Sequence, residues 1–239
     1  MARTLTHAGV WKTQPTEKRK YVSSYIQPAF KILNKNSDIH KILDVACGNG
    51  MGVTLPLLRA GYDVYCFDHT KAATDAVRRN MKSEGFKANI KRASMYKSFP
   101  YKDDAFDATF CFQAIYHGRP EQVMFVLKEI RRVTRKGGGY FISFLPFEVL
   151  HYDKKAKRYF SKSYEDGKVV GLKYRLQDKK QQHVFYPIEI KRHLHPHYQM
   201  TRKEVQDTLN SIFKSVIVKR VKRPWDIDWF YWLAYGKVK

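Results

Sequence analysis

The chain has 239 residues, of which 44% are hydrophobic and 15% aromatic, so it can bury a core and does not have the composition of a disordered polymer. Its longest apolar run, residues 140–147, is too short to span a bilayer. The three cysteines follow no CxxC or disulfide spacing, and the first residues show no apolar secretory segment. We therefore expect a reducing, cytoplasmic location.

The formal net charge is +23, from 45 basic and 22 acidic residues. This charge is spread along the chain, because residues 1–150 contribute +11 and residues 151–239 contribute +12. A field of this sign attracts RNA or other polyanions, but a lysine-rich solvated surface has the same composition. Both interpretations stay open, and no sequence feature indicates an oligomeric state.

Residues 16–33 have apolar positions at helical spacing, with Thr16 as a candidate N-cap and Pro28 as a candidate kink. Strand and helix patterns then alternate. Strands are expected at 40–47, 62–68, 88–94, 106–112 and 138–145, and helices at 52–61, 70–85 and 119–134. This alternation predicts a mostly parallel sheet in the α/β class, covered by helices on both faces.

The rest of the chain has a different pattern. A hairpin is expected over 159–177 with its turn at 165–167, then a strand at 183–190, a helix at 201–213 and strands at 214–221 and 229–238. Some 55 residues, 145–199, are thus inserted before the last helix. We expect a single domain over 1–239: an N-terminal helical segment (1–37), a core (38–144), an inserted β-rich lid (145–199) and a closing helix with strands (200–239).

The stretch "ILDVACGNGMG" (42–52) reads as a strand entering a glycine turn. A dinucleotide turn beginning at Gly48 requires glycine at position 53, where this chain has Val53, and no P-loop lysine follows. Asp44 at the strand end would repel a pyrophosphate but suits an ammonium group. Asp68, 20 residues after Gly48, is placed to accept ribose hydroxyls. An adenosine with a cationic tail fits both carboxylates; in the alternative, Asp44 only caps the next helix.

These residues resemble a known family. The class I S-adenosylmethionine-dependent methyltransferases have a motif I similar to "ILDVACGNG", a motif II similar to "VYCFDHT", and a stretch similar to residues 99–143. The resemblance, strongest to the small-molecule type, implies a three-layer Rossmann-like fold of seven strands with the last antiparallel. It also implies S-adenosyl-L-methionine as cofactor. Three positions depart from the family: Ala46 replaces a common glycine, Ser94 an acidic residue and Lys136 a proline.

The resemblance also assigns roles to residues of the cofactor site. Asp44 would orient the ammonium group, Asp68 would hold the ribose, and Ser94 with Met95 would flank the adenine. The complete set it implies is Asp44, Ala46, Cys47, Gly48, Gly50, Asp68, His69, Ser94, Met95, Phe112 and Gln113.

Residues after the expected fourth strand are placed to meet the transferred methyl group. His117, with Tyr116 beside it, is the candidate general base; a packing or helix-capping histidine is the alternative. The segment has no Asn/Asp-Pro-Pro-aromatic tetrad and no Pro-Cys pair. Their absence disfavours methylation of adenine or glutamine amino groups and of cytosine C5.

The stretch "KRHLHPHY" (191–198) places His193, His195 and His197 at alternate positions. Pro196 interrupts a strand, and no cysteine or carboxylate completes a ligand set, so we expect no metal. We interpret His195, His197 and Tyr198 as acceptor-pocket residues, with a surface loop as the alternative.

Three functions remain compatible with the sequence. A methyltransferase with a small-molecule acceptor is favoured, because an insertion of this length resembles a lid that closes over a metabolite. A tRNA or rRNA methyltransferase is the alternative that the charge suggests. A methyltransferase-like binding protein without catalysis is the third.

Overall fold

The structure is a computed structural model that describes residues 23–33, 38–146, 151–153, 158–165, 168–177, 183–187, 197–223 and 226–239. The expected N-cap Thr16 and the candidate residues His193 and His195 lie outside these ranges. Within the described ranges, no helix is long and apolar enough to cross a membrane.

The alternation predicted for the first 146 residues is confirmed. Its elements are β1 (Lys41–Val45), α3 (Thr54–Arg59), β2 (Asp63–Asp68), α4 (Lys71–Ser83), β3 (Asn89–Arg92), β4 (Phe106–Cys111), the 3-10 helix η1 (Ile115–His117), α5 (Pro120–Val133) and β5 (Thr134–Pro146). The last of these begins four residues before the strand expected at 138–145. Gly138 sits inside it, where an added Cβ would lie 2.7 Å from two backbone oxygens, so only glycine fits.

The main sheet has the order β3-β2-β1-β4-β5, and all of these strands are parallel. After α6 (Arg202–Asn210), β11 (Ser215–Arg223) forms the edge of the sheet. The last strand, β12 (Asp226–Lys237), lies between β5 and β11 and is antiparallel to both. The predicted seven strands with an antiparallel last strand are therefore confirmed.

The helix ends follow the signals in the sequence. The hydroxyl of Thr70 accepts the Ala73 N–H at 3.1 Å and caps α4, and Gly85, with a φ of 78°, follows its C-terminal end. At the start of α6, Thr201 and Glu204 form a reciprocal capping box. Helix α2 (Ser23–Leu33) runs through Pro28 without a break.

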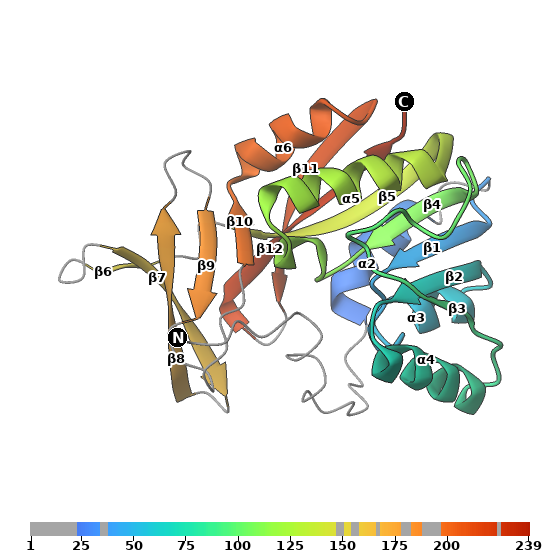
Figure 1. Cartoon of the computed structure of the whole chain (residues 1–239), viewed down its shortest axis with the longest axis horizontal. Coiled ribbons are helices and arrows are strands. Elements are labelled where there is room, and N and C mark those ends of the chain that lie inside the picture. Colours follow the sequence, from blue (N-terminus) through green and yellow to red (C-terminus); the bar gives the residue numbers. More distant parts are fainter. Residues whose placement is uncertain are drawn as a thin grey trace.

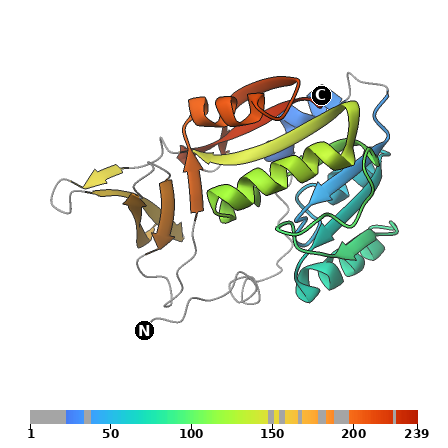
Figure 2. The same cartoon turned by 45° about the horizontal axis from the view of Figure 1, so that its top comes forward.

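Alternate residues of β5 enter two different apolar layers, as the period of two in a strand requires. Ile142 and Phe144 pack in the cluster that contains residues of α5 and α6. Phe141 packs in the cluster that contains residues of α2 and α3. Helices α5 and α6 thus cover one face of the sheet and α2 and α3 the other (Figures 1 and 2).

The insertion consists of β6 (His151–Asp153), β7 (Arg158–Glu165), β8 (Lys168–Gln177), β9 (His183–Pro187) and β10 (His197–Met200). The predicted hairpin is β7 and β8, which pair antiparallel. Strand β10, which the sequence did not predict, pairs parallel with the end of β5 and joins the inserted strands to the main sheet. The inserted hairpin lies at the opposite end of the molecule from β1–β3 (Figures 1 and 2).

Candidate functional site

In the turn after β1, every second residue has a left-handed backbone conformation: the φ values of Ala46, Gly48 and Gly50 are 54°, 57° and 77°. At Gly50, an added Cβ would lie 3.2 Å from Val77 and 3.3 Å from Met81, both on α4. Glycine is therefore required there by conformation and by packing. Ala46 adopts the same left-handed region without being glycine, which explains why many family members have glycine at this position.

Asp44 is 1% exposed and lies at the end of β1, below this turn. Its Oδ2 accepts the Thr54 hydroxyl at 2.6 Å, so it does contact the first residue of α3. Burial raises the pKa of Asp44 from 3.8 to about 7; the Thr54 hydrogen bond opposes this rise and the Asp68 carboxylate adds to it. Among the ion pairs of the described residues, none includes Asp44.

Asp68, at the end of β2, holds the turn in place. Its Oδ2 accepts the Gly48 N–H at 3.1 Å, and its Oδ1 accepts the N–H and the hydroxyl of Thr70 at 3.0 and 3.1 Å. The neighbouring His69 places its Nδ1 3.5 Å from Oδ1. Asp68 is therefore also a structural brace of the glycine turn, a role that the sequence analysis did not predict.

Cys47 lies within this turn, and its N–H donates to the Phe67 carbonyl of β2 at 3.1 Å. Burial raises the pKa of its thiol well above the usual range, so the thiol stays protonated and does not act as a nucleophile.

The candidate adenine side follows β3. Met95 is buried, and the half-buried Ser94 accepts the Tyr96 N–H at 3.2 Å with its hydroxyl. This bond closes a tight turn and places the Ser94 side chain at the carboxyl edge next to β2.

The loop that continues from this turn is fastened to α5. The Glu129 carboxylate, which is 8% exposed, accepts the Phe99 N–H at 2.6 Å and the Arg132 Nε at 2.7 Å. Arg132 in turn donates to the carbonyl of Tyr101 at 2.9 Å and to Asp103 at 2.7 Å. This network was not predicted from the sequence, where its signal is a Glu–Arg pair three residues apart on one predicted helix face.

The candidate methyl end follows β4. Gln113 has a φ of 53°, and its N–H donates to the Ser143 hydroxyl of β5 at 2.7 Å. Phe112 is half-buried, with its ring 6.4 Å from that of Tyr231 on β12. The structure therefore brings Phe112 and Gln113 to the same edge of the sheet as Asp44, because β4 lies next to β1.

Tyr116 and His117 belong to η1, with ring centroids 4.6 Å apart, and His117 is 9% exposed. Next to them, an added Cβ at Gly118 would lie 2.9 Å from the Tyr96 ring. The segment after β4 is thus packed against the loop after β3.

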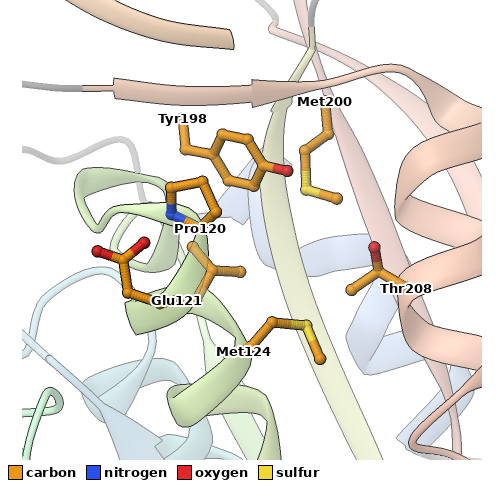
Figure 3. Close-up of a pocket in the computed structure, with 7 residues that line it drawn as sticks. Pro120, Glu121, Met124, Tyr198, Met200 and Thr208 are labelled. Carbon is orange, nitrogen blue, oxygen red and sulfur yellow. The ribbon is translucent and has the colours of Figure 1, made fainter. Parts of the chain in front are cut away.

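A groove of about 390 Å³ lies between the first turn of α5, β10 and α6, lined by Pro120, Glu121, Val123, Met124, Tyr198, Met200 and Thr208. Figure 3 shows Tyr198 and Met200 on β10, with Met124 on α5 and Thr208 on α6 across from them, and the Glu121 carboxylate pointing away. Tyr198 therefore opens on the α5/α6 face, opposite to the face of Asp44.

In the described part of the chain, no group of three metal-ligating side chains is found. This finding does not test a metal site at the alternating histidines, because His193 and His195 lie outside the described residues and only the backbone of His197 is described.

Comparisons with known proteins identify the domain that carries this site. Residues 42–138 match a family model described as a methyltransferase domain. The methyltransferase GfsG of Streptomyces halstedii is 29% identical over 100 residues, which make up 41% of this chain and 35% of that protein. The family-model match supports the class I S-adenosylmethionine-dependent methyltransferase superfamily, which the motifs also indicate. The match spans only about a third of the curated relative's length.

Solved structures share the fold over most of the chain. The PH0226 protein of Pyrococcus horikoshii OT3 superposes with a TM-score of 0.68 at 18% identity, covering 97% of this chain and 99% of that one. The 1,6-didemethyltoxoflavin-N1-methyltransferase of Burkholderia thailandensis, solved with its substrate and S-adenosylhomocysteine, gives 0.62 at 17% identity, covering 90% and 78%. The resemblance inferred from the motifs is confirmed, and so is the three-layer Rossmann-like fold.

The titration of Asp44 gives a test that needs no ligand. Because its folded-state pKa is raised, the folded protein holds a proton that the unfolded chain loses above about pH 4, so this group lowers stability as pH rises toward 7. Asp44→Asn removes the titration and keeps an oxygen for Thr54. Melting temperatures are measured by circular dichroism. The variant should melt higher than the wild type, and this difference should increase by several degrees between about pH 5 and pH 8.

The matched control is Asp75→Asn on the exposed surface of α4, where Lys71 lowers the carboxyl pKa, so its difference from wild type should stay constant over this range. A constant difference for Asp44→Asn would contradict a raised pKa.

Proposed function

We propose that this protein transfers a methyl group from S-adenosyl-L-methionine to a small-molecule acceptor. The observation that carries the proposal is Asp44, a buried carboxylate with no ion-pair partner in the described part of the chain, placed under a left-handed glycine turn. A buried carboxylate is stabilised when a cation lies beside it, and the ammonium group of the cofactor is such a cation.

The residues around this turn fit the cofactor. Gly48 and Gly50 leave the backbone without side chains where the methionine part would pass, and Asp68 lies at the end of the adjacent strand for the ribose hydroxyls. The other residues that we assign to the cofactor site are Ala46, Cys47, His69, Ser94, Met95, Phe112 and Gln113.

The bound cofactor supplies a methyl group on a sulfonium, a group that any well-aligned nucleophile can take. The positive charge of the sulfonium is dispersed as the methyl group moves to the acceptor. The main contribution of this chain is therefore to align the acceptor and to exclude water. A base is needed only when the nucleophile must lose a proton. We assign that role to His117, with Tyr116 packed against it.

Two features support a small-molecule acceptor. The insertion joins the sheet beside the end of β5, close to the carboxyl edge at which open α/β sheets bind ligands. The fold neighbour from Burkholderia thailandensis is itself named for a small-molecule substrate. His195 and His197 remain predicted acceptor residues, whereas the prediction for Tyr198 conflicts with its position on the α5/α6 face, opposite to Asp44.

Isothermal calorimetry with S-adenosylhomocysteine tests the cofactor assignment. The wild type should bind this product, and Asp68→Asn should raise its Kd about 10- to 100-fold, because a charge-assisted hydrogen bond to the ribose is lost. Asp75→Asn, on the exposed face of α4, is the control and should leave Kd unchanged. A wild type that releases no heat and shows no binding would refute the proposal.

Replacing the candidate base tests the acid–base step. With a filtrate of small molecules from a cell extract as the acceptor pool, His117→Ala should lower the rate of S-adenosylhomocysteine formation at least about tenfold and flatten its pH profile, with cofactor affinity retained. Full turnover with an unchanged pH profile would show that His117 is a packing residue.

The RNA alternative rests on the +23 charge alone and is tested by a salt series. If the charge reflects only a solvated surface, tRNA binding should be weak, and log Kd should change little with log salt concentration between about 50 and 200 mM. A steep slope, with methyl transfer to tRNA, would favour the alternative over a small-molecule acceptor.

A further inference from the structure

The end of β5 projects beyond the strands on which the cofactor site is built. The last pair between β4 and β5 is Cys111 with Ile142, whereas β5 continues to Pro146. In this overhang its partner is β10, through the pairs Gln199 with Leu145 and Met200 with Pro146. Strand β10 therefore lies past the carboxyl edge of the core strands, the region where ligands bind in open α/β sheets.

Gln199 is unusual among the buried residues of this region. The residue is 2% exposed, and within the part of the chain that the structure describes its Oε1 has no hydrogen-bond partner. Buried polar atoms are nearly always paired, since leaving one unpaired costs roughly 1–3 kcal/mol. An apolar residue would fill the same position in the strand without this cost, so the carboxamide requires an explanation.

The strand register fixes the face on which Gln199 lies. Paired residues share a face, so Gln199 lies with Leu145, and Leu145 lies with Ser143, two residues earlier on β5. This is the α2/α3 face, to which Phe141 also belongs. Tyr198 and Met200, the neighbours of Gln199, lie on the opposite face and line the groove beside α5.

The same face carries the candidate cofactor residues. Asp44 contacts Thr54 of α3, and the Ser143 hydroxyl accepts the N–H of Gln113 at the candidate methyl end. In strand order, Asp44 on β1, Phe112 after β4, Ser143 on β5 and Gln199 on β10 therefore follow one another along one face of the carboxyl edge. If the cofactor extends from Asp44 to Gln113, the methyl acceptor would bind beyond Gln113 along this edge, in the direction of Gln199.

We infer that the Gln199 carboxamide recognises the methyl acceptor, with Oε1 receiving a hydrogen bond from an N–H or O–H group of that molecule. This inference rests on the proposed function and narrows its substrate class to acceptors that carry such a donor. Gln199 is thus a specificity-determining residue, not a residue of the fold. A site built around an amide oxygen discriminates against analogues that lack the donor, because the oxygen would then stay unpaired.

Gln199→Leu separates this role from a structural one. If Oε1 is unpaired until the acceptor binds, the variant should melt about 2–4 °C higher than the wild type, because a buried unpaired oxygen has been removed. The Kd of S-adenosylhomocysteine should stay within about twofold. Methyl transfer into a small-molecule filtrate of cell extract, measured as S-adenosylhomocysteine formed at low filtrate concentration, should fall about tenfold.

The control is Gln206→Leu on α6. The Gln206 amide donates to Asn210 and to the Val216 carbonyl, both at 3.2 Å, so this variant should not melt higher and should keep full transfer. A lower melting temperature for Gln199→Leu, or unchanged transfer, would overturn the inference.

The same measurements distinguish the inference from the proposed function. A wild type that does not bind S-adenosylhomocysteine refutes the proposed function, while the melting temperatures still decide whether Oε1 is unpaired. A wild type that binds it but transfers nothing into the filtrate overturns both the small-molecule assignment and the role of Gln199.

Discussion

The site depends on a carboxylate kept away from water. Asp44 is buried at the end of β1, and burial raises its pKa to about 7. The chain provides a hydroxyl for it, from Thr54, but no cation among the described ion pairs. In the proposed function, the ammonium group of the cofactor would supply the missing charge, and cofactor binding would then be coupled to the ionisation of Asp44.

Other residues on the cofactor side hold this carboxylate and the turn above it in place. Asp68 holds the Gly48 N–H, and α4 packs so closely at Gly50 that a side chain there would have to displace Val77 or Met81. On the other face, Glu129 and Arg132 of α5 fasten the loop that follows Ser94 and Met95. Helix α5 thus supports the candidate adenine side, while the segment that leads into this helix carries Tyr116 and His117. A preformed site of this kind binds its ligand with little loss of conformational freedom.

The proposed acceptor side would be built differently. It would depend on the inserted segment, whose last strand, β10, forms two residue pairs with β5. Its two faces have separate surroundings: Tyr198 and Met200 line an apolar groove, and Gln199 lies on the face of the cofactor residues. Variation in such an insertion can change the acceptor without disturbing the core strands, which is how one fold serves many reactions.

The sequence by itself determined the fold class, most core elements and the cofactor turn, because these depend on local patterns: strand and helix periods, Thr70 and Gly85 as helix ends, and glycines next to Asp44. It did not determine β10, since four residues carry too little periodicity to identify a strand. Nor did it show that Asp68 braces the turn or that Glu129 and Arg132 hold a loop some 30 residues earlier. Only the tertiary structure decided these contacts and the burial of Gln199, because they join residues that are distant in the chain and depend on which strands become neighbours.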